Sequence, residues 1–471
     1  MKKITTTVLI CVISSLTLCN LCYAQYVKLL DFDGTLNGKA PYGSLISDGI
    51  FLYGVTSQGG TNNYGVIFKI KPDGTSYSKL HDFNNTDGKT PIGSLIYDGT
   101  FLYGMTRAGG LYLSGVIFKI KPDGTGYSKL LDFNSSSGFS SYGSLFSDGT
   151  FLYGLRRGGG TGSCTGGCGY IFKIKLDGTG YTTLFNFAGA SNGNGPNGTL
   201  ISDGIFLYGM TIFGGANDLG TIFKIKPDGS SYSKILDFDG TLKGQHPHGS
   251  LISDGTFLFG MTTDGGTDNM GVVFKIMNDG TAYSKLLDFN STNGWLPSGS
   301  LFSDGTFLYG MTRWGGADSM GVVFKIKPDA TGYSKLFDFS NVNGSFPLYD
   351  CSLISDGNFL YGMTFGGGIN NAGAIFKYGI STIIVENDEA KTFNLYPNPN
   401  NGKFNITIDN SENIRYLEAT IYNMLGEQIY SNSKFNKQSL YEVDLSASPK
   451  GIYFVKIYDG KRIYTEKIIV Q

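Results

Sequence analysis

The sequence predicts an all-β protein in which a seven-bladed β-propeller is followed by a small Ig-like β-sandwich. Three observations lead to this prediction. A unit of about 50 residues recurs seven times between residues 26 and 380, and its apolar runs have the alternation of strands. The first and last copies are incomplete in complementary ways. Repeats of this length are typical of propellers and solenoid arrays rather than of a single enzyme domain.

Each copy offers four short strands. In the second copy, residues 101–106 and 116–121 predict the two central strands and residues 127–133 the outermost strand, while residues 143–146 open the next unit. Asp-Gly pairs between strands indicate tight turns, in which glycine supplies a positive φ. Four-stranded units in this number match a propeller. The copies are most easily recognised at a Gly-Ser-Leu sequence or a close variant, which begins at Gly43, Gly93, Gly143, Gly198, Gly249, Gly299 and Cys351.

The two ends of the repeat region predict a closed ring. The first copy begins with an outermost strand at residues 26–32, whereas the last copy stops at Lys377, before a strand of that kind. If the N-terminal strand completes the seventh blade, no sheet edge stays open. Hydrophobic packing between blades should then dominate stability, because each buried Phe or Leu contributes about 1.5 to 3 kcal/mol.

Residues 1–24 have the features of a signal peptide. Lys2 and Lys3 precede an apolar run over residues 4–18, and Ala24 is the small residue that a signal peptidase requires, so we expect cleavage before Gln25. The apolar run is too short to span a membrane, and no other stretch is long enough to form a transmembrane segment. We therefore expect the mature protein, beginning with a propeller over residues 25–380, to leave the cytoplasm.

Bulk composition excludes some partners. The net charge is -1 and the pI is near 6.3, so the chain offers no electrostatic reason to bind nucleic acid or an acidic membrane surface. The 70 glycines recur at fixed places in the repeat and indicate turns rather than low complexity. Nothing in the pattern predicts a cofactor.

The repeat resembles the GloVer tandem-repeat family, which occurs in secreted and surface-anchored bacterial proteins. The resemblance rests on the sequences Gly-Ser-Leu, Asp-Gly, Phe-Leu-Tyr-Gly-Met-Thr, Gly-Gly and Phe-Lys-Ile-Lys-Pro-Asp-Gly, and it covers residues 26 to about 380. It implies no settled activity, so function must be argued from the site.

After Ile380 the repeat ends, and residues 381–392 have the composition of a linker. Alternating runs in residues 393–471 predict a small β-sandwich. The distinctive residues of this segment are Tyr396, Pro397, Asn398, Pro399, Gly402, Gly426, Gly451 and Tyr453.

With these residues the segment resembles the type A C-terminal sorting domain of type IX secretion in Bacteroidetes. The resemblance implies periplasmic transit, interaction with the type IX translocon and its sortase, and a final location that is extracellular or on the outer cell surface. The alternative is an Ig-like adhesive module, because such sandwiches host many roles.

The sequence shows no catalytic constellation and no metal site. Residues 26–380 contain no Glu, and their recurrent aspartates, such as Asp48, suit turns. His246 and His248 could offer two metal ligands, but Pro247 separates them and no Cys is near, so an ordinary loop is favoured.

Two cysteines lie in the longest Gly-rich loop, at Cys164 and Cys168. An oxidising compartment and a flexible loop favour a local disulfide over free thiols. A metal site built on these two cysteines is less favoured, because no further Cys or His is close in sequence.

The copies differ most from each other along one predicted rim of the ring, which carries the Gly-Gly loops and the loops before each Gly-Ser-Leu. Exposed aromatic side chains beside Arg and Asn would make a binding rim, since loops on a rigid scaffold commonly carry function. The alternative is drift in unconstrained loops. The ligand-binding candidates are Tyr42, Arg107, Phe139, Tyr142, Arg157, Phe213, His248, Trp295, Arg313 and Trp314.

We therefore expect a non-catalytic surface module that binds a glycan or a surface-protein partner, because aromatic rings flanked by polar groups suit sugar faces. Two other functions stay open. A polysaccharide lyase or hydrolase at the channel mouth would be indicated if His248, Asp350 and Tyr42 or Tyr142 shared one pocket. A structural cell-surface protein would be indicated by a flat, featureless rim.

Overall fold

The chain forms two compact units, residues 1–380 and 381–471. The computed structural model describes residues 26–134, 142–297, 299–348, 351–380, 393–408, 418–423, 428–432, 440–458 and 463–470. Every regular element within these ranges is a β-strand, which confirms the all-β prediction. No helix in the described ranges is long and apolar enough to cross a membrane. The predicted signal peptide and linker lie outside these ranges.

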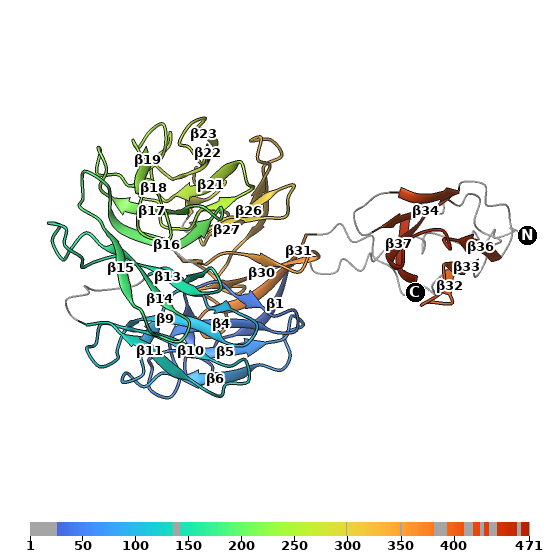
Figure 1. The fold of residues 1–471 in the computed structure, drawn as a ribbon, viewed down its shortest axis with the longest axis horizontal. Coiled ribbons are helices and arrows are strands. Elements are labelled where there is room, and N and C mark those ends of the chain that lie inside the picture. The colour runs from blue at the N-terminus through green and yellow to red at the C-terminus, as the bar shows by residue number, and fades with distance from the viewer. Residues whose placement is uncertain are drawn as a thin grey trace, which may run out of the picture. The chain divides into compact units, whose positions relative to one another are not determined.

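Seven antiparallel sheets of four or five strands follow one another along the described part of the first unit (Figure 1). The first sheet contains β2 (Lys39–Pro41), β3 (Ile46–Ser47), β4 (Leu52–Gln58), β5 (Val66–Ile70) and β6 (Ser78–Asp82). The second contains β7 (Lys89–Pro91), β8 (Ile96–Tyr97), β9 (Leu102–Ala108), β10 (Val116–Ile120) and β11 (Ser128–Asp132). The third contains β12 (Phe146–Ser147), β13 (Phe151–Arg156), β14 (Tyr170–Lys175) and β15 (Thr182–Asn186).

The remaining sheets repeat this meander. The fourth contains β16 (Asn194–Ser202), β17 (Leu207–Phe213), β18 (Thr221–Ile225) and β19 (Ser233–Asp237). The fifth contains β20 (Ile252–Ser253), β21 (Phe257–Thr262), β22 (Val272–Met277) and β23 (Ser284–Asp288). The sixth contains β24 (Trp295–Pro297), β25 (Phe302–Ser303), β26 (Leu308–Trp314), β27 (Val322–Ile326) and β28 (Ser334–Asp338). The seventh contains β29 (Ile354–Ser355), β30 (Phe359–Thr364), β31 (Ala374–Gly379) and β1 (Tyr26–Asp31).

The core of the first unit lies between successive sheets. Tyr53 and Ile67 of the first sheet, for example, pack in one cluster with Leu102 and Phe118 of the second, and all four are almost fully buried. The two central strands of each sheet are thus covered on both faces, as their largely apolar sequences predict.

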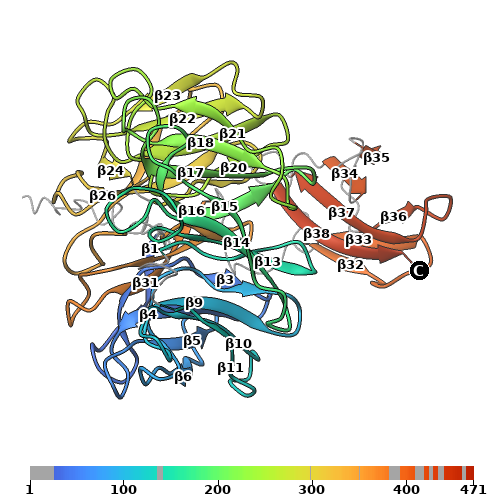
Figure 2. The same cartoon turned by 60° about the vertical axis from the view of Figure 1, so that its left-hand side comes forward.

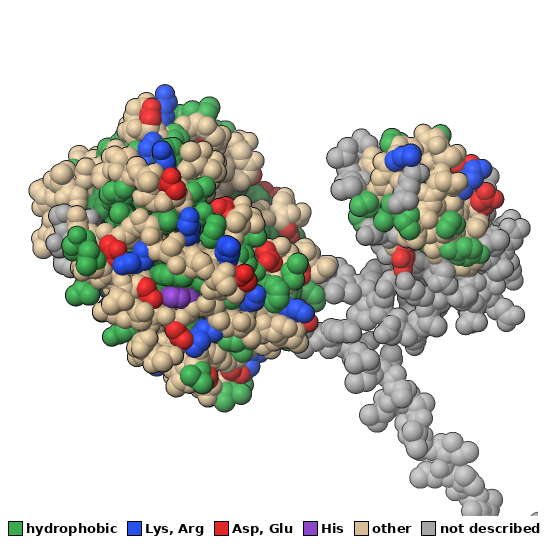
Figure 3. All heavy atoms as spheres, turned by 60° about the horizontal axis from the view of Figure 1, so that its bottom comes forward, with side chains coloured by type: hydrophobic (Ala, Val, Ile, Leu, Met, Phe, Trp, Pro, Cys, Tyr) green, Lys and Arg blue, Asp and Glu red, His purple; other side chains and the backbone are tan. Residues whose placement is uncertain are grey.

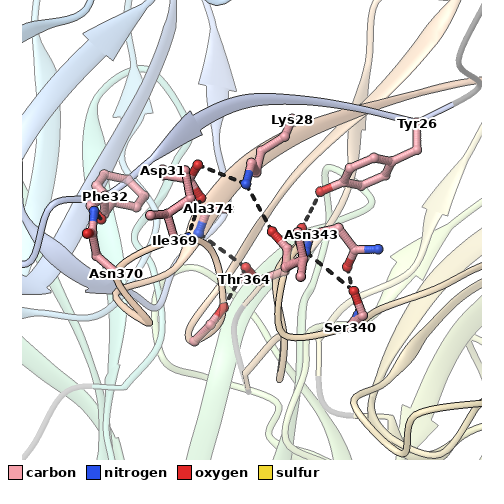
Figure 4. A network of polar contacts seen from close by, with 12 residues as sticks. Tyr26, Lys28, Asp31, Phe32, Ser340, Asn343, Thr364, Ile369, Asn370 and Ala374 are labelled. Carbon is pink, nitrogen blue, oxygen red and sulfur yellow. Dashed lines mark hydrogen bonds and ion pairs between the residues drawn. The ribbon is translucent and has the colours of Figure 1, made fainter.

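The N-terminal strand completes the seventh sheet, since β1 pairs antiparallel with β31. Figure 4 shows the side chains that fasten it. The Tyr26 hydroxyl donates to the Asn343 carbonyl, and Lys28 lies 2.8 Å from Asp31 and donates to the Val342 carbonyl at 2.9 Å. The first and last segments of the repeat region are therefore locked together.

A second set of contacts closes the ring from inside. The backbone N–H of Ser44 donates to Ser94 Oγ at 2.7 Å. Equivalent bonds join the second repeat to the third and the fourth to seventh repeats to one another, and the N–H of Ser352 donates to Ser44 Oγ at 2.8 Å. A glycine precedes this residue in six repeats, and Cys351 does so in the seventh, because the backbones nearly touch: a Cβ on Gly43 would lie 2.7 Å from the carbonyl carbon of Gly93. The sheets therefore surround one narrow axis, a propeller-like arrangement.

One feature differs from the four strands that the sequence predicts in each unit. The innermost strand is only two residues long in most sheets, and three sheets have an added strand, β2, β7 or β24. The inner strand is short because its Gly-Ser-Leu backbone bonds around the axis rather than along the sheet. The added strand contains a residue with a left-handed backbone, such as Ala40 with φ 55°. The Ala40 N–H donates to the carbonyl of Ala372 in the seventh repeat.

The second unit contains two sheets that share one core (Figure 2). Phe404 of one sheet packs in a cluster with Ile421, Val455 and Ile468 of the other. One sheet contains β32 (Phe393–Tyr396), β33 (Lys403–Ile408) and β36 (Leu440–Asp444). The other contains β34 (Glu418–Asn423), β35 (Gln428–Asn432), β37 (Gly451–Tyr458) and β38 (Ile463–Val470).

Candidate ligand-binding rim

Antiparallel sheets place alternate turns at opposite ends. The Asp-Gly turns lie at one end of every sheet, and the Gly-Gly loops lie at the other end with the loops that precede the innermost strands. We call this second end the Gly-Gly rim; residues 33–42 and 58–65 and their equivalents in later repeats form it.

The recurrent aspartates of the opposite end maintain the turns. Asp48 Oδ1 accepts the N–H groups of Ile50 and Phe51, and its Oδ2 accepts the Tyr53 hydroxyl at 2.7 Å. Partial burial raises the pKa of Asp48, but these hydrogen bonds outweigh burial and lower it overall. In the fifth repeat Phe259 replaces the tyrosine. Asp254 therefore accepts the two turn N–H groups but no tyrosine hydroxyl at this position. Turn chemistry explains this series, as the sequence predicts.

Most lysines of the first unit also serve the scaffold. Lys69 Nζ lies 4.7 Å from the centroid of the Phe51 ring and donates to the carbonyl of Pro122 in the next sheet at 3.0 Å. On the outermost strands a lysine and an aspartate form an ion pair, as Lys129 and Asp132 do at 2.9 Å. Figure 3 shows positive and negative side chains interspersed over one face of this unit, without a patch of a single sign.

Candidate residues of the second to fourth repeats meet on the rim. The guanidinium carbons of Arg107 and Arg157 lie 5.0 and 5.1 Å from the centroid of the Tyr142 ring. Arg157 also lies 6.0 Å from the Phe213 ring. Arg107 is exposed, whereas Tyr142, Arg157 and Phe213 are half-buried. We call these four residues the arginine–tyrosine sector.

Two histidines adjoin this sector. His246 packs edge-on against Phe213 with ring centroids 5.2 Å apart, and its Nδ1 lies 3.1 Å from Asp264 Oδ2. Burial, together with the positive charge of Arg157, lowers the pKa of His248 to about 3, so this imidazole is neutral. Burial raises the pKa of Asp264, but hydrogen bonds from His246 and Thr263 lower it overall, so this residue is a carboxylate.

A second aromatic group lies on the sixth sheet. Trp295 in β24 is the cross-strand partner of Trp314 in β26, with ring centroids 6.4 Å apart. The Phe346 and Trp314 ring centroids lie 4.5 Å apart, and the Arg313 guanidinium carbon lies 5.7 Å from the centroid of the Trp314 ring. The Trp295 side chain remains 39% exposed. We call these four residues the tryptophan sector.

The remaining candidates are placed as follows. Tyr42 packs edge-on against Phe365 of the seventh repeat, with centroids 5.5 Å apart. Phe139 lies outside the described residues, as does Asp350, so the pocket that would indicate an enzyme is not described as a whole. Arg157 lies over the Tyr142 ring, and its positive charge contributes to the lowered pKa of His248.

Sequence reasoning missed four aromatic or charged partners: His246 and Asp264, Phe346, and Phe365. His246 and Phe346 each have φ 55° and stand where Ala40 stands in the first repeat. A left-handed backbone is unfavourable for such side chains and is characteristic of functional or constrained sites. A repeat alignment that compared this column could have found both residues.

Cys164 and Cys168 form a disulfide within the Gly-rich loop of the third repeat, directly after Arg157 in the chain. Cys168 is fully buried in the core between the third and fourth sheets. Among the described residues, no group of three His, Cys, Asp or Glu side chains is arranged to hold a metal ion.

In the second unit the predicted sorting residues gather at the last strand. Asn398 Oδ1 accepts the N–H of Ile469 in β38 at 2.9 Å, and Gly402 has φ 98° in a close approach to Ser446. Tyr453, which follows Gly451 in β37, is buried and donates its hydroxyl to the Pro449 carbonyl. The peptide bonds before Pro397 and Pro399 are cis, and Tyr396 is exposed. Gly426 lies outside the described residues.

The repeat region matches the family described as the Gloeobacter/Verrucomicrobia repeat three times, over residues 13–166, 152–278 and 249–396. The chain belongs to this repeat family. Residues 394–471 match the secretion system C-terminal sorting domain, which belongs to type IX secretion. This domain indicates interaction with the type IX secretion machinery and export to the cell surface or extracellular space.

The solved structures that match this repeat-family chain share little sequence with it, and no curated protein matches it. An oligogalacturonate lyase from Vibrio parahaemolyticus is 11% identical with a TM-score of 0.47, over 76% of this chain and 94% of that one. A putative 6-phosphogluconolactonase from Bacteroides uniformis is 13% identical with a TM-score of 0.46, over 83% and 98%. A second putative 6-phosphogluconolactonase, from Bacteroides fragilis, is 14% identical with a TM-score of 0.46, over 86% and 97%. Similarity at this level says nothing about the activity of this chain.

Proposed function

We propose that the protein is a non-catalytic surface module that binds a glycan through its Gly-Gly rim. In this proposal residues 1–24 are a signal peptide, residues 25–380 a seven-bladed β-propeller, residues 381–392 a linker, and residues 393–471 an Ig-like sorting sandwich. The closed ring of seven sheets and the paired β-sheets of the second unit support this division.

The observation that carries the binding proposal is the tryptophan sector. Trp295 is paired with Trp314, which is backed by Phe346, so the rings are held in place before any ligand arrives, and Trp295 still has an exposed face. Fixed aromatic faces suit the apolar faces of sugars and lose little conformational entropy on binding.

The distribution of exposed apolar side chains supports the same rim. Single exposed apolar residues are ordinary, but an uneven distribution marks an interaction surface. Among the described residues of the first unit, Ile50, Tyr97 and Ile205 are the large exposed apolar side chains at the Asp-Gly end. Those on the Gly-Gly rim are Leu36, Leu111, Tyr112, Leu113, Leu242, Trp295, Val342 and Ile369.

The binding proposal predicts that Trp295→Ala and Trp314→Ala each weaken glycan binding by about tenfold, the equivalent of about 1.4 kcal/mol. The measurement is a glycan array with the full-length protein, followed by titration with the best oligosaccharide. Tyr97→Ala is the matched control, because Tyr97 is a similarly exposed aromatic residue at the opposite end. No binding to any glycan, or binding indifferent to both tryptophans, would contradict the proposal.

A further inference from the structure

The arginines of the repeat region are distributed unlike its lysines. Residues 26–380 contain only four arginines, and each stands two or three residues before a Gly-Gly pair: Arg107, Arg156, Arg157 and Arg313. Lysines instead recur on the strands, where Lys69 and its equivalents bind neighbouring carbonyls and Lys129 and its equivalents pair with aspartate. Three of the four, Arg107, Arg157 and Arg313, occupy the same position of the repeat, and the first two lie in adjacent repeats.

The arginine–tyrosine sector presents its two cations in a fixed arrangement. Both guanidinium carbons lie within about 5 Å of one Tyr142 centroid, at 5.0 Å for Arg107 and 5.1 Å for Arg157. Stacking on an aromatic ring occupies the face of a guanidinium group and leaves the N–H groups at its edge for hydrogen bonds. Such a fork matches a carboxylate with two parallel N–H···O bonds.

Arg157 differs from the lysines of the scaffold in its partners among the described residues. Arg157 forms no salt bridge with a described carboxylate, whereas the lysines of the outermost strands do. Arg156, fully buried beneath the rim with its guanidinium 4.1 Å from the Phe133 centroid, adds a third positive charge to the same side of the ring. Asp264, the carboxylate at the edge of the sector, is engaged by His246. Arg107, Arg156 and Arg157 thus bring three arginine side chains to this part of the ring.

We propose that the arginine–tyrosine sector binds an acidic sugar, with the carboxylates of a uronic acid polysaccharide held by Arg107 and Arg157 and a sugar ring lying near Tyr142 and Phe213. This inference rests on the proposed glycan-binding function and names the ligand class. Arg107 and Arg157 occupy equivalent places in adjacent repeats, so one chain running along the rim contacts both.

The test uses the full-length protein and isothermal titration with an alginate-derived hexasaccharide. The carboxyl-reduced form of the same oligosaccharide is the neutral probe, and a sulfated neutral oligosaccharide distinguishes sulfate from carboxylate. We expect the acidic hexasaccharide to bind at least about tenfold more tightly than its reduced form, and its affinity to fall as salt rises, because exposed charges are screened.

Three variants locate the interaction. Arg157→Gln and Arg157→Lys should each weaken binding of the acidic probe by about tenfold or more, because lysine lacks the planar fork. Lys121→Gln is the matched control, since it removes one exposed positive charge at the opposite, Asp-Gly end of the second repeat and should change this binding less than about twofold. Circular dichroism and thermal unfolding confirm that each variant is folded.

The outcomes separate the two proposals. Equal affinity for the acidic and reduced probes, preference for the sulfated probe, or equal losses with Arg157→Gln and Lys121→Gln would overturn the acidic-sugar inference. Loss of neutral-glycan binding in the tryptophan variants would still support the proposed function. Absence of binding to every oligosaccharide would overturn both.

Discussion

At the scale of single residues, the scaffold is maintained by one small set of side chains that recurs in every repeat. Asp48 and its equivalents each accept two turn N–H groups, and in six of the seven repeats a tyrosine hydroxyl as well. The fifth repeat, with Phe259, is a natural variant that lacks this hydroxyl contact. The cost of losing one such bond is about 0.5 to 1.5 kcal/mol.

These aspartates predict acid sensitivity. Hydrogen bonds, outweighing burial, lower the pKa values of Asp48, Asp98, Asp148, Asp203, Asp304 and Asp356 in the folded state. A group whose pKa is lower folded than unfolded stabilises the fold above its unfolded pKa, about 3.9 for Asp, and loses that contribution as the pH falls through its folded pKa. We expect the melting temperature to fall modestly from pH 7 to about pH 5, because the buried His248 stays neutral in the folded state, and to fall more steeply below about pH 4, where the aspartates also lose their contribution.

The hydroxyl contact can be tested separately. Tyr208→Phe should lower the free energy of unfolding at pH 7 by about 1 kcal/mol, because it leaves one carboxylate oxygen without its donor. Urea unfolding measures the change. Phe257→Leu, which alters a half-buried ring in the fifth repeat without touching an Asp–Tyr bond, reports the effect of ordinary repacking. For the pH dependence, an unchanged melting temperature of the unmodified protein at pH 3 would contradict the contribution of the aspartates to stability.

At the scale of elements, the loops of the Gly-Gly rim differ in how they are stabilised. In the first repeat Asn63 Oδ1 accepts the Gly59 N–H at 2.9 Å and Asn62 donates to the Phe83 carbonyl at 3.2 Å. The longer loop of the third repeat uses the Cys164–Cys168 disulfide instead. This loop follows Arg157 directly, so its rigidity bears on the position of that arginine.

Removing the disulfide should therefore loosen one loop rather than the whole unit. We expect the Cys164→Ala, Cys168→Ala variant to show faster hydrogen exchange in residues 159–168, with a loss of unfolding free energy of about 2 kcal/mol at most, because so short a closed loop restricts the unfolded chain little. Exchange in residues 109–115 of the second repeat, which has no cysteine, is the internal control. Uniformly faster exchange in all loops would contradict a local role.

At the scale of the whole first unit, stability depends on closure. Each sheet packs against two neighbours, and the seventh sheet receives its outermost strand from the opposite end of the chain. Around the axis, hydrogen bonds between successive repeats return from Ser352 to Ser44. Loss of one closing element exposes both a sheet edge and the apolar surface beneath it.

Deletion of residues 26–32 should open the ring. The change removes β1 and Phe32, which is fully buried in the core cluster shared with Phe68 and Phe376. We expect a melting temperature lower by several degrees and aggregation, because the bared β31 edge can pair with another chain. Light scattering and thermal unfolding measure both effects. Tyr26→Phe, which removes only the hydroxyl contact with Asn343, should stay soluble and show a smaller decrease in melting temperature. A deletion variant with unchanged melting temperature and solubility would contradict closure of the ring by β1.

The sequence alone determined the repeat, the strand order, the export signal at the C-terminus and the closing role of residues 26–32. Each of these follows from local patterns: alternation along a strand, glycine at a turn, or a motif read in one stretch. It also identified the variable rim, because the same positions differ in successive copies.

Only the tertiary structure decided which variable residues meet. Tyr142 lies between arginines that stand 35 positions before it and 15 after it in the chain, and Phe346 joins Trp314 from the following repeat. These contacts depend on how far one sheet is rotated about the axis relative to the next and on the left-handed residues that direct side chains over the rim. Neither the rotation between sheets nor the direction of these side chains can be recognised from a periodic pattern in the sequence. Both arise from packing between repeats and not from the order of residues within one repeat.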